Sequence, residues 1–242
     1  MTDKIKLKKL VEIFDEILKI KENEWLVDDL LRMIEKNFKV NELAKNSIIR
    51  EIHEHCIEQV TENQAKDFYK DFPMEKIKNS LIIDFKKMEH ERRRDDFYNF
   101  GLCLYQQIEN ITQHLFLGKD IQVLYEKNQN KIINDKKQQT LNSLIFRNSG
   151  DKFWYPNKKF VAILYFVVYK EDMQPKNYYS ITDLSFNFDE VYQIRNMNHR
   201  GGEQTEFQRK IVERIQNNES SYYLKFYGFL NRFVVEIKNS FI

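Results

Sequence analysis

The longest helical pattern in the chain runs through MEKIKNSLIIDFKKMEHERRRDDFYNFGLCLYQQIENITQHLFLG, residues 74–118. Its apolar residues recur at intervals of three and four on both sides of a charged stretch at 89–96, which places them on one face of an α-helix. They are Ile77, Leu81, Ile82, Phe85 and Met88, followed by Phe97, Phe100, Leu104, Ile108, Ile111 and Leu115. The pattern predicts one long amphipathic helix.

The charged stretch inside this helix holds three consecutive arginines, residues 92–94. Arginines bind phosphate well, but acidic residues flank these three on both sides (Glu89, Glu91, Asp95 and Asp96). Opposite charges three and four positions apart on a helix pair with each other. We therefore expect a solvated helix surface or internal ion pairs here rather than a phosphate-binding surface.

Three further amphipathic patterns precede this helix. They cover residues 5–20, 25–38 and 41–64. The series ends at Asp71-Phe72-Pro73, because proline disfavours helix in the residue before it. We predict a helical N-terminal region of unknown role at residues 1–72 and a second helical domain at residues 73–242.

The sequence after Gly118 changes character twice. Residues 119–150 are polar, which favours a surface loop or a short helix on a flexible tether. Residues 160–169 are apolar throughout, so their period does not distinguish a buried strand from a buried helix. We prefer a buried central helix, because no second strand of this kind exists to pair with it. Two helical patterns, 207–215 and 222–241, close the chain.

Composition supports an all-α fold. Only 6 Gly and 3 Pro occur among 242 residues, and this shortage of turn formers favours long helices. The net charge of +2 gives the molecule no strong overall field toward nucleic acid or membranes, so any anion site must be a local patch. Cys56 and Cys103 lie within apolar helical patterns, which suggests two buried thiols rather than a disulfide or a metal framework.

The chain carries no feature of a secreted or membrane protein. Its N-terminus lacks the apolar core of a signal peptide, and its longest uncharged run is about half as long as a bilayer span requires. We expect a cytoplasmic protein without membrane association. His53 and His55 are two apart, whereas the helix of a zinc protease carries histidines four apart. We therefore expect no metal site, and no cofactor.

The segment VYQIRNMNHRGG, residues 191–202, holds the side chains best suited to chemistry. On a helix, Arg195 and His199 are four apart and project from one face. A guanidinium grips phosphate through a planar fork of donors, and an imidazole gives or takes a proton near neutral pH. The pair therefore suits phosphodiester chemistry at a helix end, which Gly201-Gly202 would mark. The alternative is that both side chains are solvated cations that interact favourably with the negative C-terminal end of the helix dipole.

A family resemblance extends over about residues 80–242. It rests on a long helix ending in FYNFGLCLYQQIENI (97–111), a middle helix, the segment IRNMNHRG (194–201) and a final helix. This order resembles the HEPN superfamily of helical bundles, many of which are RNases of toxin–antitoxin, abortive-infection and CRISPR systems. The family usually leaves four to six residues between Arg and His, whereas three intervene here and Arg200 occupies the commonest histidine position. Either the site tolerates the shorter spacing or catalysis has been lost.

The resemblance implies a homodimer whose two Arg-His pairs line one cleft and cleave single-stranded RNA without a metal. Arg195 would stabilise charge on the phosphate, His199 would transfer protons, and Asn196 would orient the helix start or the substrate. Arg200 would hold a neighbouring phosphate, and Glu109 would pair with Arg195 or position His199. The protein would act in prokaryotic defence or as a toxin, with an antitoxin or a CRISPR or other defence protein as partner. The alternative is a catalytically inactive module that binds RNA or protein.

Overall fold

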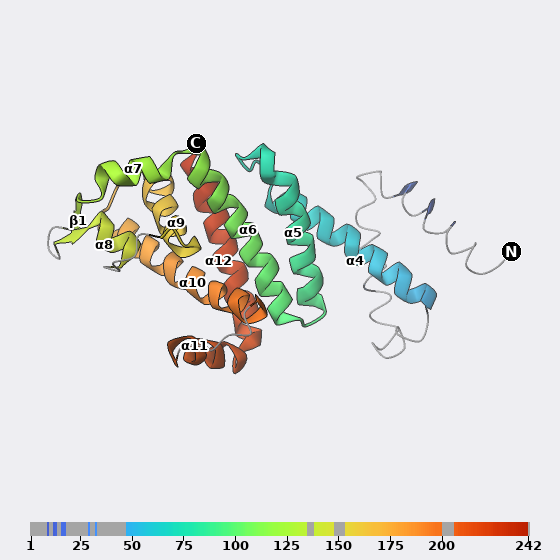
Figure 1. Ribbon diagram of the computed structural model, residues 1–242. Coiled ribbons are helices and arrows are strands. Elements are labelled where there is room, and N and C mark those ends of the chain that lie inside the picture. Colours follow the sequence, from blue (N-terminus) through green and yellow to red (C-terminus); the bar gives the residue numbers. More distant parts are fainter. Residues whose placement is uncertain are drawn as a thin grey trace. The chain divides into compact units, whose positions relative to one another are not determined.

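The computed structural model describes residues 9, 12, 13, 16, 17, 29, 32, 47–134, 138–147, 153–199 and 206–241, with the backbone alone at 47–50, 197–199, 207 and 208 (Figure 1). These residues are predominantly helical and include one two-stranded sheet, which confirms the all-α class. In this part of the chain, no helix has the length and apolar character needed to cross a membrane. The chain divides into two compact units, residues 1–68 and 69–242.

The first unit contains α4 (Ser47–Phe68), which overlaps the pattern predicted at 41–64. Cys56 is buried on this helix, and Ile52, Ile57 and Val60 pack against it. The sulfur is a free thiol, as expected. An apolar stripe at helical spacing thus forms a small hydrophobic cluster along α4.

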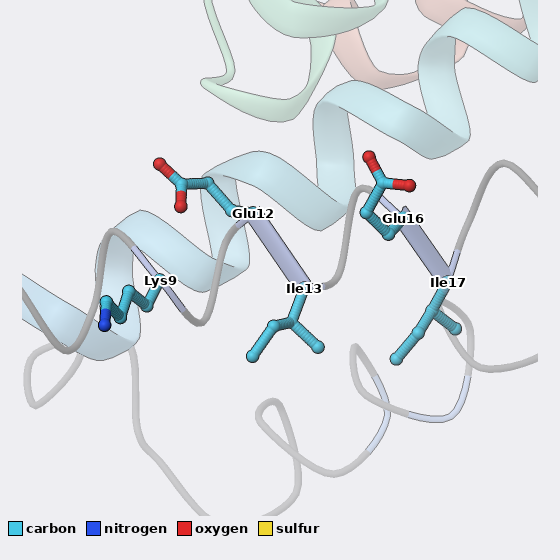
Figure 2. A pocket seen from close by; sticks show the side chains of 5 residues that line it. All are labelled: Lys9, Glu12, Ile13, Glu16 and Ile17. Atoms are coloured by element: carbon cyan, nitrogen blue, oxygen red, sulfur yellow. The ribbon is translucent and has the colours of Figure 1, made fainter.

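Helical spacing is also seen near the start of the first unit. Lys9, Glu12, Ile13, Glu16 and Ile17 are all helical and line a pocket (Figure 2). Ile13 and Ile17 point to one side, and Glu12 and Glu16 point to the other (Figure 2). At these positions, the first predicted pattern is therefore helical.

The second unit begins with a helical hairpin. The single helix predicted for residues 74–118 is wrong, because α5 (Glu75–Arg93) and α6 (Phe97–Gly118) are separate helices that pack against each other. Asp95 has a positive φ of 58° between them. The Asp96 carboxylate then accepts a hydrogen bond from the Asn99 amide at 3.0 Å and caps α6. Aspartate favours such caps over helix interiors, a preference that apolar periodicity does not register.

The charged stretch before this turn forms an ion pair within α5. Arg92 Nη2 lies 2.7 Å from Glu89 Oε2, three residues earlier on the helix. Glu89 is buried, whereas the arginine side chain is largely exposed. The internal ion pairing predicted for this stretch is confirmed at this position.

Helix α6 lies at the centre of the second unit, where it packs against α5, α9, α10 and α12 (Figure 1). The last three of these helices are α9 (Pro156–Ile163), α10 (Pro175–His199) and α12 (Glu219–Ser240). Another helix, α11 (Glu206–Gln216), joins α10 to α12 in the chain and contacts both. The core of the unit therefore surrounds α6.

Aromatic rings fill much of this core. Phe97 and Phe100 of α6 contact Tyr223 of α12, with ring centroids 5.1 and 4.9 Å apart. Just before α5, the buried Tyr69 donates a hydrogen bond through its hydroxyl to Gln107 Oε1 at 2.8 Å. The polar end of a buried tyrosine thus finds a partner on the central helix.

The polar region after α6 is more ordered than the predicted loop. It forms α7 (Ile121–Asn128), the antiparallel strands β1 (Ile132–Asn134) and β2 (Gln139–Thr140), and α8 (Leu141–Phe146). Most of its few apolar residues are buried (Ile121, Tyr125, Ile133, Leu141, Leu144, Ile145 and Phe146). Low average hydrophobicity hid these anchors, and of the two predicted alternatives the described residues contain short helices, α7 and α8, rather than a surface loop alone.

The apolar run at 160–169 is a buried helix, as predicted. Helix α9 begins at Pro156 and continues directly into a π-helical segment, η3 (Leu164–Val168). The Tyr169 amide donates to the Leu164 carbonyl at 2.9 Å, a bond that spans five residues. This wider turn was not evident from the sequence, because π-helices have no distinct apolar period.

Candidate functional site

The predicted site lies at the C-terminal end of α10. Buried residues recur along this helix at intervals of three and four, as its packing against α6, α9 and α12 requires (Ile181, Leu184, Phe188, Val191 and Ile194). The helix is continuous through its last residue, His199. Arg195 and His199 are therefore one helical turn apart, as the sequence predicted. Arg195 and Asn196 are both half-buried there.

Two contacts hold the Arg195 guanidinium. Its Cζ lies 5.6 Å from the ring centroid of Tyr105 on α6, and its Nη1 donates a hydrogen bond to Asn196 Oδ1 at 3.1 Å. A guanidinium over an aromatic face is attracted by the electrons of the ring. The structure thus brings Arg195 and Asn196 together and restricts the cation without burying it fully.

Glu109 reaches this cation through Tyr105. The Tyr105 hydroxyl donates to Glu109 Oε1 at 2.8 Å, one turn along α6. Burial raises the pKa of the Tyr105 hydroxyl, Glu109 raises it further through its hydrogen bond and charge, and the Arg195 charge opposes the rise. The phenol therefore remains a donor at neutral pH. Among the described residues, Glu109 and Arg195 form no direct ion pair.

A row of stacked rings leads from the core to Arg195. Phe160 of α9 stacks on Phe188 with ring centroids 4.5 Å apart, and Phe188 stacks on Tyr192 at 6.3 Å. Tyr105 closes the row at 5.9 Å from Tyr192. Phe188, Tyr192 and Arg195 follow one another along one face of α10 at intervals of four and three. The position of the guanidinium is thus set by rigid neighbours.

The two helices that carry these residues approach closely beside the site. A Cβ placed on Gly101 of α6 would lie 2.7 Å from Ile194 Cγ2 on α10, inside van der Waals contact. Only glycine fits this position without a shift of the Ile194 side chain or of one helix. Because Ile194 directly precedes Arg195, Gly101 sets the distance between α6 and the end of α10.

Ion pairs attach α10 to three neighbouring elements. Each of three acidic residues on this helix binds a cation from elsewhere (Asp183 with Arg232, Asp189 with Arg147, and Glu190 with Arg214 and Lys225). These bonds neutralise the acidic side chains of α10 before its last turns. Arg195 is then the next charged residue along the helix.

Two of the predicted site residues fall outside this description. The side chain of His199 and the whole of Arg200 are not among the described residues, and neither are Gly201 and Gly202. For His199, the structure therefore gives its position on the helix and no contact.

Comparison of the chain with family models, with curated proteins and with solved structures gives no match. The candidate site therefore rests on its own geometry. Within the described ranges, no three His, Cys, Asp or Glu side chains are grouped so that they could hold a metal ion. A half-exposed guanidinium beside an amide oxygen, held on an aromatic ring, is suited to binding a phosphate or carboxylate.

Sequence reasoning missed the residues that support Arg195. The roles of Tyr105, Tyr192 and Gly101 were not predicted. The spacing of four between Tyr105 and Glu109 was a usable signal for their hydrogen bond. The contact of Tyr192 with Tyr105 and that of Gly101 with Ile194 cross between helices, and no spacing within one helix encodes them.

Proposed function

We propose that this protein is a metal-independent endoribonuclease of the HEPN type that cleaves single-stranded RNA with Arg195 and His199. The observation that carries the proposal is the unbroken last turn of α10, which places His199 one turn after a guanidinium held by Tyr105 and Asn196. A fixed cation and a titratable imidazole on one face supply charge stabilisation and proton transfer. The protein would work as a cytoplasmic homodimer in defence or as a toxin, restrained by an antitoxin or another defence protein.

The reaction requires only groups from this chain and from the RNA. The ribose 2′-hydroxyl attacks the adjacent phosphorus, a bond forms from O2′ to phosphorus, and the bond from phosphorus to O5′ breaks. His199 takes the 2′ proton or gives a proton to the leaving O5′, and the partner copy supplies the second imidazole. Arg195 stabilises the negative charge that develops on the phosphate oxygens. Asn196 orients Arg195, and Arg200 contacts a neighbouring phosphate.

The direct test is RNA cleavage in the presence of EDTA. Wild-type protein should convert a fluorescently labelled single-stranded RNA to fragments with 2′,3′-cyclic phosphate and 5′-hydroxyl ends. His199→Ala and Arg195→Ala should lower the rate by about 100-fold or more, since each removes a group that acts in the transition state. Arg209→Ala is the matched control, because this arginine of α11 is exposed and lies outside the proposed site.

Two results would contradict the nuclease proposal. One is an intact RNA after incubation with the wild-type protein. The other is equal cleavage by wild type and His199→Ala, which would indicate a contaminating RNase. A substrate with a single 2′-deoxy sugar at the cleaved position should resist the enzyme, because it lacks the attacking oxygen.

A specific observation favours a second function, a non-catalytic module that binds RNA or a partner protein. Only Asn196, Met197 and Asn198 separate Arg195 from His199, fewer than is usual in the family that the sequence resembles. Tight RNA binding without cleavage, weakened by Arg195→Ala, would support this function over the nuclease.

A further inference from the structure

Two large aromatic rings are exposed on the short segment that precedes α9. Phe153 is 72% exposed and Tyr155 is 47% exposed, and their ring centroids lie 6.1 Å apart. Exposed aromatic rings on a protein surface mark interaction sites when something holds them in place.

Trp154, between the two exposed rings, anchors the segment in the core. Its ring packs against Phe116 of α6, Tyr125 of α7 and Phe146 of α8, with centroid distances of 5.0, 5.2 and 5.1 Å. Helix α9 starts directly after the segment, at Pro156. With one ring anchored and a helix following, Phe153 and Tyr155 are held on the outside at little further cost in conformational entropy.

One lysine lies beside the exposed pair of rings. Lys158 Nζ lies 5.0 Å from the ring centroid of Tyr155 and 4.8 Å from that of Phe146. The next lysine, Lys159, holds its ammonium 5.1 Å from the ring of Phe116. A protein partner would be expected to cover a continuous apolar surface, whereas here the exposed ring of Tyr155 adjoins the ammonium of Lys158. This combination suits a polyanion that carries flat bases.

The segment is tied to the helix that carries Arg195. Asn157 Nδ2 donates to Asp189 Oδ1 on α10 at 3.4 Å, and Arg147, the residue directly after α8, pairs with Asp189 Oδ2 at 2.7 Å. Asp189 precedes Arg195 by six residues, about 9 Å along the helix axis. α8, α9 and α10 lie together in the second unit (Figure 1). The exposed rings and Arg195 are thus parts of one packed body.

We infer that Phe153, Tyr155 and Lys158 form a stacking platform for single-stranded RNA. Two bases of the strand stack on the exposed rings, and Lys158 contacts a neighbouring phosphate. The platform binds the strand outside the site at Arg195 and favours unpaired substrates, because paired bases do not offer their faces. This inference rests on the proposed function for the choice of RNA as ligand.

The test is fluorescence anisotropy of a labelled oligouridine of about 12 nucleotides, within the roughly 4–16 that single-strand-binding folds cover. The full-length chain carries His199→Ala so that the RNA stays intact. Phe153→Ala and Tyr155→Ala should each raise Kd by about fivefold or more. Tyr155→Phe should leave Kd unchanged. Lys158→Gln should reduce the slope of log Kd against log salt by about 0.7, as expected for one phosphate contact on a single strand.

Two control variants distinguish base stacking from nonspecific binding to exposed apolar side chains. Tyr179→Ala is the matched control, since this tyrosine of α10 is 70% exposed and lies apart from the platform residues in sequence, and it should not change Kd. Phe153→Leu keeps an apolar side chain and removes the aromatic face, so it should bind nearly as weakly as Phe153→Ala. An unchanged Kd in the Phe153→Ala/Tyr155→Ala double variant would overturn the inference. So would full RNA binding by Phe153→Leu, because a leucine side chain offers no aromatic face on which a base can stack.

The outcomes also separate this inference from the nuclease. If cleavage depends on His199 but substitution of Phe153 and Tyr155 does not change Kd, the nuclease proposal is supported and the stacking platform is ruled out. If RNA binding depends on both rings but the wild type does not cleave RNA, the stacking platform is supported and the nuclease proposal is ruled out. Thermal melts of each variant are compared with the wild type, and a change in Kd counts only for variants whose melting temperature is unchanged; Phe153, which is 72% exposed, should meet this condition.

Discussion

Glu190 is the most heavily bonded acidic side chain on α10. It is 1% exposed, and its carboxylate accepts hydrogen bonds from Arg214 Nη2 and Lys225 Nζ at 2.5 Å each and from the Tyr222 hydroxyl at 3.3 Å. Both cations are partly exposed, so water stabilises their charges while the carboxylate depends on them. One residue of α10 thus holds α11 and α12 in place.

Removing this carboxylate should destabilise the second unit. Glu190→Ala is expected to lower the free energy of unfolding by about 1–3 kcal/mol, because the Tyr222 hydroxyl is left buried without a partner while the two cations turn to water. Urea denaturation followed by circular dichroism measures the change. Glu206→Ala is the control, since its pair with Lys210 has a length of 2.7 Å but is exposed on both sides, and no measurable change is expected.

Cys103 should react slowly with alkylating reagents at neutral pH. Burial raises the pKa of this thiol to about 11, and the nearby charges of Asp84 and Glu91 add to the rise. At pH 8, iodoacetamide should therefore modify Cys103 in a Cys56→Ser variant at least about tenfold more slowly than an unperturbed thiol. Asp84→Asn should speed the reaction. A half-maximal rate near pH 8.5 would contradict the expectation.

The same shift affects stability at high pH. A pKa that is raised in the folded state means that folding favours the neutral thiol. The contribution of Cys103 is therefore complete below the pKa of the unfolded thiol, about 8.5, and is lost as pH rises toward 11.

At the scale of elements, the close approach of α6 and α10 determines where the site lies. Gly101 allows the contact with Ile194, and the rings of Tyr105 and Tyr192 meet one turn away from it. Two helices that approach this closely do so because one of them lacks a side chain at the contact. The end of α10 is therefore positioned by the Ile194 side chain against Gly101 and by the contact between two tyrosine rings.

Alanine substitution at two glycines isolates this contact. Gly101→Ala should lower stability, because overpacking against Ile194 costs about 1–3 kcal/mol and alanine returns only about 1 kcal/mol of helix propensity. Gly228→Ala in the interior of α12 should raise stability by up to about 1 kcal/mol, since no atom lies within 4 Å of the added Cβ. Thermal unfolding of the two variants gives the change in unfolding free energy for each, and the difference between the two changes is the cost of the steric clash at Gly101. Equal stabilisation by both substitutions would show that the helices have room to move apart.

At the scale of the whole molecule, the start of the second unit carries two buried rings. Tyr69 and Phe72 are 0% and 1% exposed, and their ring centroids lie 5.4 Å apart. Tyr69 also contacts Phe85 at 6.3 Å and donates to Gln107. Both residues precede the domain boundary predicted between 72 and 73, which remains a prediction.

Two truncations test that boundary. A fragment of residues 69–242 should retain the stability of the second unit, whereas a fragment of residues 73–242 loses both rings and the hydrogen bond to Gln107. The shorter fragment should be less stable by about 3 kcal/mol or more, given the cost of removing a buried aromatic side chain. Urea unfolding of both fragments is the measurement. Equal stability would place the boundary at 72/73.

The sequence by itself determined which faces of the chain are buried. Intervals of three and four predicted helices that the structure contains, the uniform apolar run at 160–169 is a buried helix, and the one-turn spacing of Arg195 and His199 is present on α10. These features are local, because helix geometry fixes the relation between residues three or four apart. The break after α5 is also local, but its signal is a capping aspartate rather than an apolar period.

Only the tertiary structure decided which side chains meet. Tyr105 lies under Arg195, Ile194 contacts Gly101, and Trp154 anchors two exposed rings, although these partners are far apart in sequence or on different helices. The apolar period predicts that a residue is buried, but it does not predict which residue the buried side chain contacts. The neighbour depends on how the ridges of one helix fit the grooves of another, and that fit is a property of both helices together.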